Sequence, residues 1–408
     1  MARGKTRAEE TVEPETVAPA RRRQTETQQR NAELLLDAMV IETDSHGLDY
    51  LRSARVAQAV GLTTGALYSR YENADEMLVA LWQERVAEPY LAHTRDVIRY
   101  VRGELPRQHP ITHQVLNPSP LLRLGAEFTV VATRNDTIGE VVIPAVQSTL
   151  AELGLRDHSD SLEGAVVMIA ASAAIGTALR SFVTGTNPGW DAALTSLRLA
   201  AENVKSLPHT PLNEDQPPLP INTGNPVRDA LLTSAKRVVA RVGFKNATIT
   251  RIARRAGFST SAIYQLWSDK EAMLDEAIHE VSVLDYSANA RAKQSAVQLN
   301  RGDFGFTDSW YFGLMPSRRA RLDFRLECLI ASRHNANTRK ELRRIVDQSD
   351  AILQASFPKL PHSVTATIAS MEQALGYGFT AVNKFVPSAR QLDYFSFMVA
   401  LAKLGPLA

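Results

Sequence analysis

The sequence predicts an all-α protein built from two similar helical units. Apolar residues recur at spacings of three and four along most of the chain, for example at Leu231, Ala235, Val238 and Val242, and alternating strand-like patterns are scarce. A stretch of the first half of the chain returns in the second half. A proline-rich segment between the two copies divides the chain into parts of similar size.

Composition narrows the class of protein. With 408 residues the chain is long enough for two or more domains, and 44% apolar and 22% charged residues are typical of a globular protein. The net charge of +2 indicates no particular partner. No run of 18 apolar residues and no signal peptide is found, so we expect a cytoplasmic protein that makes no membrane contact. Cys328 is the single cysteine, which excludes an internal disulfide.

Two segments poor in large apolar residues mark the domain boundaries. Residues 1–26 mix charge, Pro and Thr and predict a disordered tail. The 21 residues from Ser206 to Pro226 hold six prolines, and we expect a semi-extended linker over 206–225. Each remaining part is predicted to hold a short N-terminal helical domain and a longer one, at residues 27–85 with 86–205, and at residues 226–281 with 282–408.

The internal repeat is the main clue to the architecture. Residues 47–78 align with 243–274 without a gap and give nine identities in 32 positions, among them Gly61/Gly257 and Tyr68/Tyr264. The likeness continues weakly downstream, where VVATRNDTIGEV (130–141) is similar to LIASRHNANTRKEL (329–342), and IGTAL (175–179) to LGYGF (375–379). Each half therefore looks like one copy of a whole unit.

The second copy carries the start and stop signals of short helices. A helix that begins near Pro226 is predicted to stop around Gly243. Thr248 is expected to cap a helix over 249–256, which ends at Gly257. Ser259 is expected to cap a helix over 260–266, and Asp269 the helix after it. Two short helices joined by a glycine-containing turn predict a helix-turn-helix.

The last short helix presents two different faces. Ile263 and Trp267 are four residues apart and are predicted to point inward. The other face carries hydroxyl and amide groups, on Thr260, Ser261, Tyr264 and Gln265. Such groups can reach phosphate oxygens and base edges in a DNA major groove.

The segment TITRIARRAGFSTSAIYQLWSDKEAML (248–274) resembles the DNA-binding signature of the tetracycline-repressor (TetR) family. The resemblance is strong over 226–281 and moderate over 30–85. It implies that 27–85 and 226–281, here called the first and second heads, are three-helix DNA-binding domains. It also implies that 86–205 and 282–408 are helical ligand-binding and dimerisation domains. In this family a small, mostly apolar effector usually relieves repression.

The resemblance also implies which residues meet DNA. In the first head, these are Thr63, Thr64, Gly65, Tyr68, Ser69 and Arg70. In the second head, they are Thr248, Arg251, Ser259, Thr260, Ser261, Tyr264, Gln265 and Lys270.

The first head departs from the family pattern. Arg52 replaces the capping threonine, although Ser53 offers a cap one residue later, and Ala74 replaces the lysine. Residues 28–85 hold five Lys/Arg and nine Asp/Glu, net −4, whereas residues 224–281 hold nine and six, net +3. Because phosphate contacts supply much of the affinity for DNA, the second head is predicted to bind more strongly. The alternative is that the first head has lost DNA binding altogether.

Two heads in one chain suggest an intramolecular pseudo-dimer. Helix-turn-helix proteins commonly bind DNA as two-fold dimers, and the linker is long enough for one chain to supply both heads. We expect residues 162–204 to pack against residues 363–404, and the operator to hold two unlike half-sites because the recognition faces differ. A homodimer of such chains remains open.

For the effector, the candidate contacts are apolar residues of the longer domains: Phe128, Met168, Trp310, Tyr311, Phe324 and Met371. No nucleophile elbow, dinucleotide fingerprint, phosphate-binding loop or zinc-protease motif is present in the sequence, so no enzymatic activity and no catalytic residue are expected. No metal or cofactor is expected either.

Overall fold

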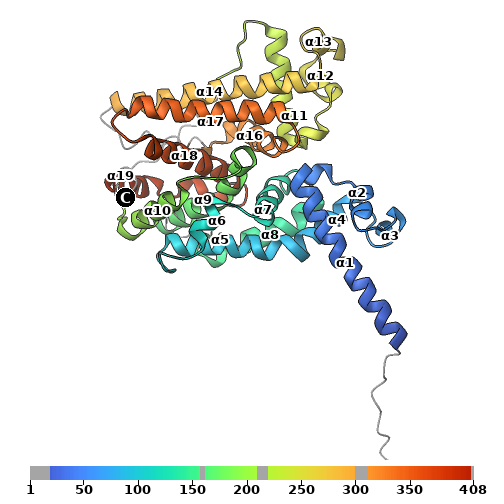
Figure 1. Cartoon of the computed structure of the whole chain (residues 1–408). Coiled ribbons are helices and arrows are strands. Elements are labelled where there is room, and N and C mark those ends of the chain that lie inside the picture. Colours follow the sequence, from blue (N-terminus) through green and yellow to red (C-terminus); the bar gives the residue numbers. More distant parts are fainter. Residues whose placement is uncertain (1–18, 157–160, 209–218, 299–310, 312, 406–408) are drawn as a thin grey trace, which may run out of the picture.

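The computed structural model describes the chain except for residues 1–18, 157–160, 209–218, 299–310, 312 and 406–408. Helix accounts for 77% of the structure, and the residues that it describes contain no strand, which confirms the predicted all-α class. Figure 1 shows two layers of helices, the first half of the chain below and most of the second half above.

The first half runs from α1 to α10. Its elements are α1 (Pro19–His46), the 3-10 turn Leu48–Tyr50, α2 (Ser53–Ala59), α3 (Thr64–Tyr68), α4 (Ala74–Leu81), the π-turn Trp82–Val86, α5 (Ala87–Val101), α6 (Ile111–Leu116), α7 (Pro120–Val131), α8 (Asp136–Glu152), α9 (Ser161–Thr184) and α10 (Trp190–Asn203).

The second half runs from α11 to α19. Its elements are α11 (Pro226–Asn246), α12 (Ile249–Ala256), α13 (Thr260–Tyr264), α14 (Lys270–Gln298), the 3-10 turn Pro316–Arg318, α16 (Arg319–Ala331), α17 (Ala336–Ser356), α18 (His362–Val382), the 3-10 turn Pro387–Gln391 and α19 (Tyr394–Lys403).

Helix α1 corrects the predicted N-terminal boundary. It begins at Pro19, so residues 19–26 belong to a helix and not to a disordered tail. The rest of that predicted tail, 1–18, lies outside the described residues. The charge and polarity of 19–26 suggested disorder, but Ala, Arg, Gln and Glu, which make up most of this segment, are also good helix formers.

Local signals place α11 as the sequence predicted. The Asn225 side chain accepts hydrogen bonds from the backbone N–H groups of Val227 and Arg228, and Pro226 occupies the first turn. Gly243 has a φ of +78°, which kinks the helix at the position where it was expected to stop.

Helices α9 and α18, from opposite halves, pack together at the centre of the molecule (Figure 1). Helices α10 and α19 flank this pair, and the Trp190 indole N–H donates a 2.9 Å hydrogen bond to Ser370 Oγ across the halves. These helices lie largely within residues 162–204 and 363–404, the two segments that the sequence predicted to pack against each other.

Two buried ion pairs join the halves in a reciprocal way. Arg134, which follows α7, reaches Glu327 of α16 with Nε 2.6 Å from Oε1. Arg333, which follows α16, pairs with Glu127 of α7. Both carboxylate side chains and both guanidinium groups are at most 6% exposed. Each half therefore gives one Arg and one Glu to the other half, the pattern of an isologous contact.

Helix α9 is long and apolar enough to cross a membrane by length and composition, although no membrane contact was expected from the sequence. In the structure, 89% of its most apolar window is buried. A helix that is apolar all round and covered by other helices is a core helix, and α18 and α5 supply that cover here.

Candidate functional site

The second head is built around α12 and α13. Thr248 Oγ1 accepts a 3.3 Å hydrogen bond from the N–H of Arg251 and so caps α12, as predicted. Gly257 ends the helix with a φ of +79°, a conformation that a residue with a side chain adopts at a cost. The turn that follows directs the chain into α13.

Helix α13 buries one face and exposes the other. Ile263 is fully buried and Trp267 is 7% exposed, whereas the Tyr264 side chain is 59% exposed. Ser261 and Gln265 are also exposed and Thr260 is half-buried. The inward and outward faces are therefore those predicted from the spacing, and a surface of hydroxyl, amide and phenol groups faces solvent.

Two details of this head differ from the prediction. Ser259 precedes α13 but makes no side-chain capping hydrogen bond, so its exposed hydroxyl is not used to end the helix. Helix α13 also ends at Tyr264 and not at 266. A helix this short has few backbone hydrogen bonds to propagate, and burial of Ile263 fixes its position instead.

Lys270 is folded inward at the start of α14. Its Nζ lies 3.3 Å from the Phe244 carbonyl oxygen and 3.8 Å from Glu271 Oε1, and its side chain is 20% exposed. Asp269 caps the helix by accepting a 2.8 Å hydrogen bond from Ala272 N–H, and this bond lowers the pKa of its carboxyl group. Lys270 must swing outward to meet a phosphate.

The first head has the same arrangement with different contacts. Thr63 caps α3 by accepting a 3.2 Å hydrogen bond from Ala66 N–H, and Leu67 is the buried residue of the helix. The predicted contact residues all lie exposed on this head: Thr63, Thr64, Gly65, Tyr68, Ser69 and Arg70.

Two polar groups of the first head are engaged within the head. Tyr68 Oη lies 2.8 Å from Ser53 Oγ, and Ser69 Oγ donates to the Ala66 carbonyl at 2.8 Å. Ser53 therefore does not cap α2, contrary to the expectation; α2 begins at Ser53 itself, and Arg52 precedes it without a side-chain cap. The helix is left with fewer satisfied N-terminal N–H groups than its counterpart α12.

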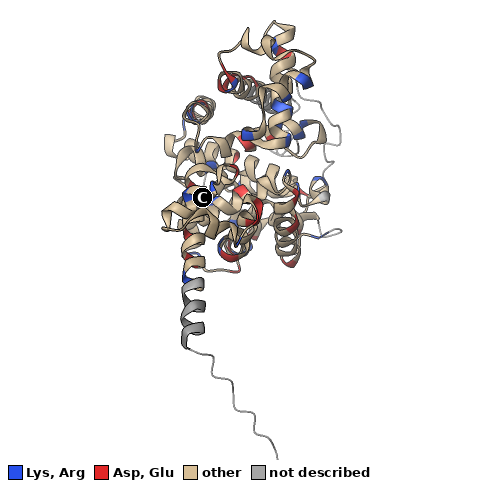
Figure 2. Ribbon diagram, turned by 90° about the vertical axis from the view of Figure 1, so that its right-hand side faces the viewer, with Lys and Arg blue, Asp and Glu red and all other residues tan. Residues whose placement is uncertain are grey.

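The two heads lie on the same side of the molecule and differ in charge. Figure 2 views that side and shows Lys and Arg gathered on the second head, at the top, with Asp and Glu frequent around the first head. On α12, Arg251, Arg254 and Arg255 are exposed. On the first head, Arg55 is held 3.0 Å from Glu42. The second head therefore offers the more favourable surface for a polyanion.

A direct contact joins the two heads. Lys245, at the end of α11, places Nζ 2.5 Å from the Asp49 carbonyl oxygen and 5.4 Å from the centre of the Tyr50 ring. The Arg134 guanidinium group binds the Asp49 carboxylate at 2.8 and 3.1 Å and packs against Gly243, where a Cβ would come within 2.7 Å of its central carbon. Side chains of both halves therefore contribute to the contact between the heads.

Sequence reasoning did not identify these joining residues. Arg134 and Arg333 do occupy matching places in the similar segments VVATRN and LIASRHN, which was the available signal. A repeat shows only that both halves keep an arginine; it does not show that each arginine pairs with the opposite half.

Residues 231–277 match the family model described as bacterial regulatory proteins, tetR family. The match covers α12 and α13, whose exposed face has just been described, and it supports a TetR-family regulator that binds DNA. The first head lies outside the matched range, so the tandem duplication stays a prediction. No curated protein matches the chain.

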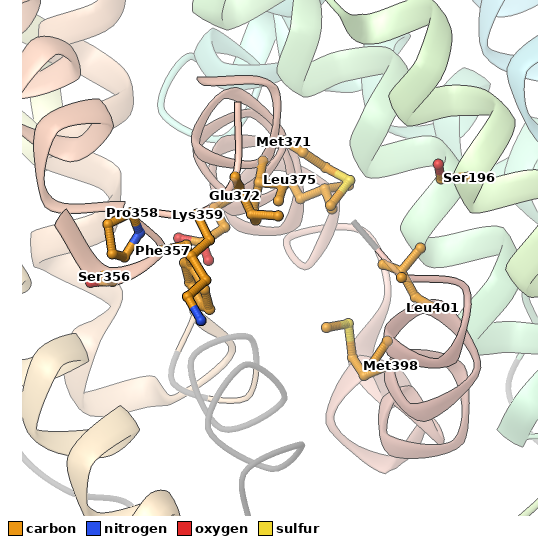
Figure 3. Close-up of a pocket in the computed structure, with 14 residues that line it drawn as sticks. Ser196, Ser356, Phe357, Pro358, Lys359, Met371, Glu372, Leu375, Met398 and Leu401 are labelled. Carbon is orange, nitrogen blue, oxygen red and sulfur yellow. The ribbon is translucent and has the colours of Figure 1, made fainter. Parts of the chain in front are cut away.

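The predicted effector residues lie in different surroundings. Phe128, Met168, Tyr311 and Phe324 belong to the buried core, and Trp310 lies outside the described residues. Phe128 packs against the Trp82 ring with centroids 5.4 Å apart. Met371 lines a cavity of about 610 Å³ beside α18 (Figure 3). Within the part of the chain that the structure describes, no cluster of three potential metal ligands is present.

Proposed function

We propose that this protein is a ligand-responsive transcriptional repressor of the cytoplasm, and not an enzyme, in which one chain supplies both DNA-binding heads. The observation that carries the DNA-binding role is the exposed face of α13, within the range that matches the TetR family. Its hydroxyl, phenol and amide groups suit phosphate and base-edge contacts in a major groove.

A mobility-shift assay at low salt tests this role. The Tyr264→Ala and Lys270→Ala proteins are expected to lose affinity for operator DNA, because each removes a polar group from the second head. Tyr68→Ala is the matched variant in the first head, where a smaller loss is expected because that head is acidic. Unchanged binding by the Tyr264→Ala/Lys270→Ala double variant would contradict the regulator function.

The pseudo-dimer is the second part of the proposal. The reciprocal pairs Arg134–Glu327 and Arg333–Glu127 support it, as does the packing of α9 on α18. In a two-fold dimer the same contacts would be made between two chains. Light scattering at micromolar concentration is expected to give the mass of one chain, 44.9 kDa, and a stable species of twice that mass would favour the homodimer.

The operator is proposed to have two unlike half-sites. The first head presents Gly65, Ser69 and Arg70 where the second presents Ser261, Gln265 and Leu266, so the two heads offer different hydrogen-bonding groups to bases. Genomic footprinting of the purified protein tests this. A perfectly palindromic site would contradict it.

The alternative is that only the second head contacts DNA. The net charge of −4 over residues 28–85 and the engagement of Tyr68 with Ser53 favour this alternative. It predicts a footprint over one half-site and an affinity that Tyr68→Ala leaves unchanged, whereas two working heads predict a measurable loss.

A further inference from the structure

A cavity of about 610 Å³ lies between the two halves, away from both heads. Figure 3 shows α10 of the first half on one side and α18 and α19 of the second half on the others. The loop that joins α17 to α18 lines a further side. Its lining is mainly apolar and includes Phe357, Leu360, Met371, Leu375, Met398 and Leu401. This size is in the range of sites for small organic molecules.

Ser196 is the polar group on the first-half side of this cavity. The residue is 2% exposed, and its hydroxyl has no hydrogen-bond partner among the described residues. A buried hydroxyl without a partner costs free energy that a bound hydrogen-bonding group recovers. A ligand group in the cavity is one way to supply that partner.

The residue that matches Ser196 in the second half, Ser396, already has hydrogen-bond partners. Ser396 stands seven residues before the end of α19 at Lys403, as Ser196 stands seven before the end of α10 at Asn203. Ser396 Oγ accepts a 2.8 Å hydrogen bond from the linker residue Leu207 and donates a 2.6 Å bond to Asp393.

The two halves also differ in the apolar residues that they offer to such a cavity. Five residues before the end of α19 stands Met398, which lines the cavity, and the matching residue of α10 is Arg198. Arg198 is bound to the Leu105 carbonyl at 2.6 Å and to Glu202 at 2.8 Å. The two halves therefore differ where a symmetric pair of sites would be expected.

Two charged side chains, Lys359 and Glu372, lie side by side in the lining (Figure 3). Glu372 already has an interaction of its own. Lys359 is exposed, lies across the cavity from Ser196, and has no ion pair among the residues that the structure describes, so it is the charge that a ligand can meet. Met371 and Met398 line the space between these two residues, and methionine side chains adapt to ligands of differing shape.

We propose that this cavity binds one small anionic amphiphile per chain, with its carboxylate paired to Lys359, its apolar body against Met371 and Met398, and a second polar group hydrogen-bonded to Ser196. This inference rests on the proposed ligand-responsive function and assigns its ligand to this cavity. Because it spans α10 and α18–α19, its ligand contacts both halves at once.

Titration calorimetry without DNA tests the ligand class. The probes are octanoate, decanoate and dodecanoate, their ω-hydroxy forms and the corresponding alcohols, each below its micelle concentration. We expect one molecule per chain, acids that bind more tightly than alcohols, and a gain of roughly fivefold from the ω-hydroxyl at the length that spans the cavity. Two molecules per chain, equal affinity of acids and alcohols, or no binding by any probe would each overturn the proposal.

Variants assign the binding to the cavity. Lys359→Gln is expected to weaken the acids roughly threefold and to leave the alcohols unchanged. Ser196→Ala removes the gain from the ω-hydroxyl. Ala402→Trp, at an exposed lining position, is expected to abolish binding, whereas Ala355→Trp, exposed but outside the lining, should not. Equal binding by both Trp variants would place the ligand elsewhere and contradict the proposal.

The DNA assay keeps the two proposals apart. Ala402→Trp lies far from both heads along the chain and is expected to bind DNA like the unmodified protein. If it binds DNA and the unmodified protein ignores every amphiphile, the ligand site fails while the DNA-binding function stands. If amphiphiles bind as expected and DNA is ignored at low salt, the regulator function fails while the ligand site stands.

Discussion

Gly176 of α9 meets the backbone of Ala374 in α18 with no room for a side chain: a Cβ at Gly176 would lie 1.8 Å from the Ala374 carbonyl oxygen. The contact repeats in the opposite sense, since a Cβ at Gly378 would lie 1.9 Å from the Ser172 carbonyl oxygen. The two helix backbones thus approach as closely as glycine permits, and the halves of the chain are joined by main-chain packing as well as by side chains.

Substitution of these glycines is expected to force α9 and α18 apart. Gly176→Ala and Gly378→Ala each place a methyl group against backbone that has nowhere to move, and overpacking of this kind costs about 3 kcal/mol of unfolding free energy. Gly376→Ala is the control, because no atom lies within 4 Å of its Cβ position and alanine favours the helix. Denaturant unfolding measures all three. A Gly376→Ala variant as unstable as the others would contradict the close approach.

Loss of one partner of the buried Arg134–Glu327 pair is expected to destabilise the fold more than loss of both partners. Arg134→Met leaves the carboxylate of Glu327, 3% exposed, without its closest cation and is predicted to cost about 4 kcal/mol. The double variant Arg134→Met/Glu327→Leu removes both charges and should recover much of the loss, as measured by denaturant unfolding.

A surface pair supplies the control for this experiment. Arg95 lies 3.6 Å from Glu88, whose side chain is 80% exposed, so Arg95→Met is expected to change stability by less than about 0.5 kcal/mol. If Arg134→Met has as small an effect, or if the double variant is less stable than Arg134→Met alone, the coupling between the halves is not carried by this pair.

The parts of the fold that the sequence predicted are those set by neighbouring residues. Pro226, Thr248, Gly257 and Asp269 act within three residues of themselves, so the ends of the second-head helices follow from local chemistry. The buried face of α13 follows from the spacing of Ile263 and Trp267 in the same way.

The parts that it did not predict depend on distant residues. The Arg134–Glu327 and Lys245–Asp49 contacts join residues about two hundred positions apart, and nothing in either local segment indicates its partner. The inward folding of Lys270 and the engagement of Ser53 by Tyr68 depend on tertiary neighbours as well. The sequence predicted which face of α13 is exposed, but it did not show which polar groups of the two heads are already engaged.

The contribution of the residue at the N-terminus of the first short helix to the unfolding free energy is expected to differ between the two heads. Thr248→Ala removes the hydrogen bond to Arg251 N–H and is predicted to lower the unfolding free energy by about 1 kcal/mol. Ser53→Ala in the first head removes no cap, since Ser53 Oγ bonds Tyr68 Oη on an exposed surface, and should cost clearly less. Thermal unfolding of the two variants side by side checks the order, and equal losses would show that Ser53 does cap α2.

Stability is expected to fall as the pH is lowered, in part through His334. Burial lowers the pKa of its imidazole from 6.5 to about 4, and the neighbouring Arg333 cation acts in the same direction. The ring packs against Tyr50 with centroids 4.0 Å apart, so the neutral form is the one that the fold accommodates. Between pH 6.5 and 4 the unfolded chain therefore binds more protons at this residue than the folded chain, and the unfolding free energy must decrease as the pH falls through that window.

Replacement of the imidazole tests this contribution. His334→Phe keeps a ring against Tyr50 and cannot be protonated, so its loss of stability from pH 7 to pH 5 is expected to be about 1 kcal/mol smaller than that of the unmodified protein. His362→Phe, at an exposed position, serves as the comparison and should retain the pH dependence of the unmodified protein. Denaturant unfolding at the two pH values measures the difference. Parallel losses in His334→Phe and the unmodified protein would mean that His334 is not held neutral in the fold and that other groups cause the acid sensitivity.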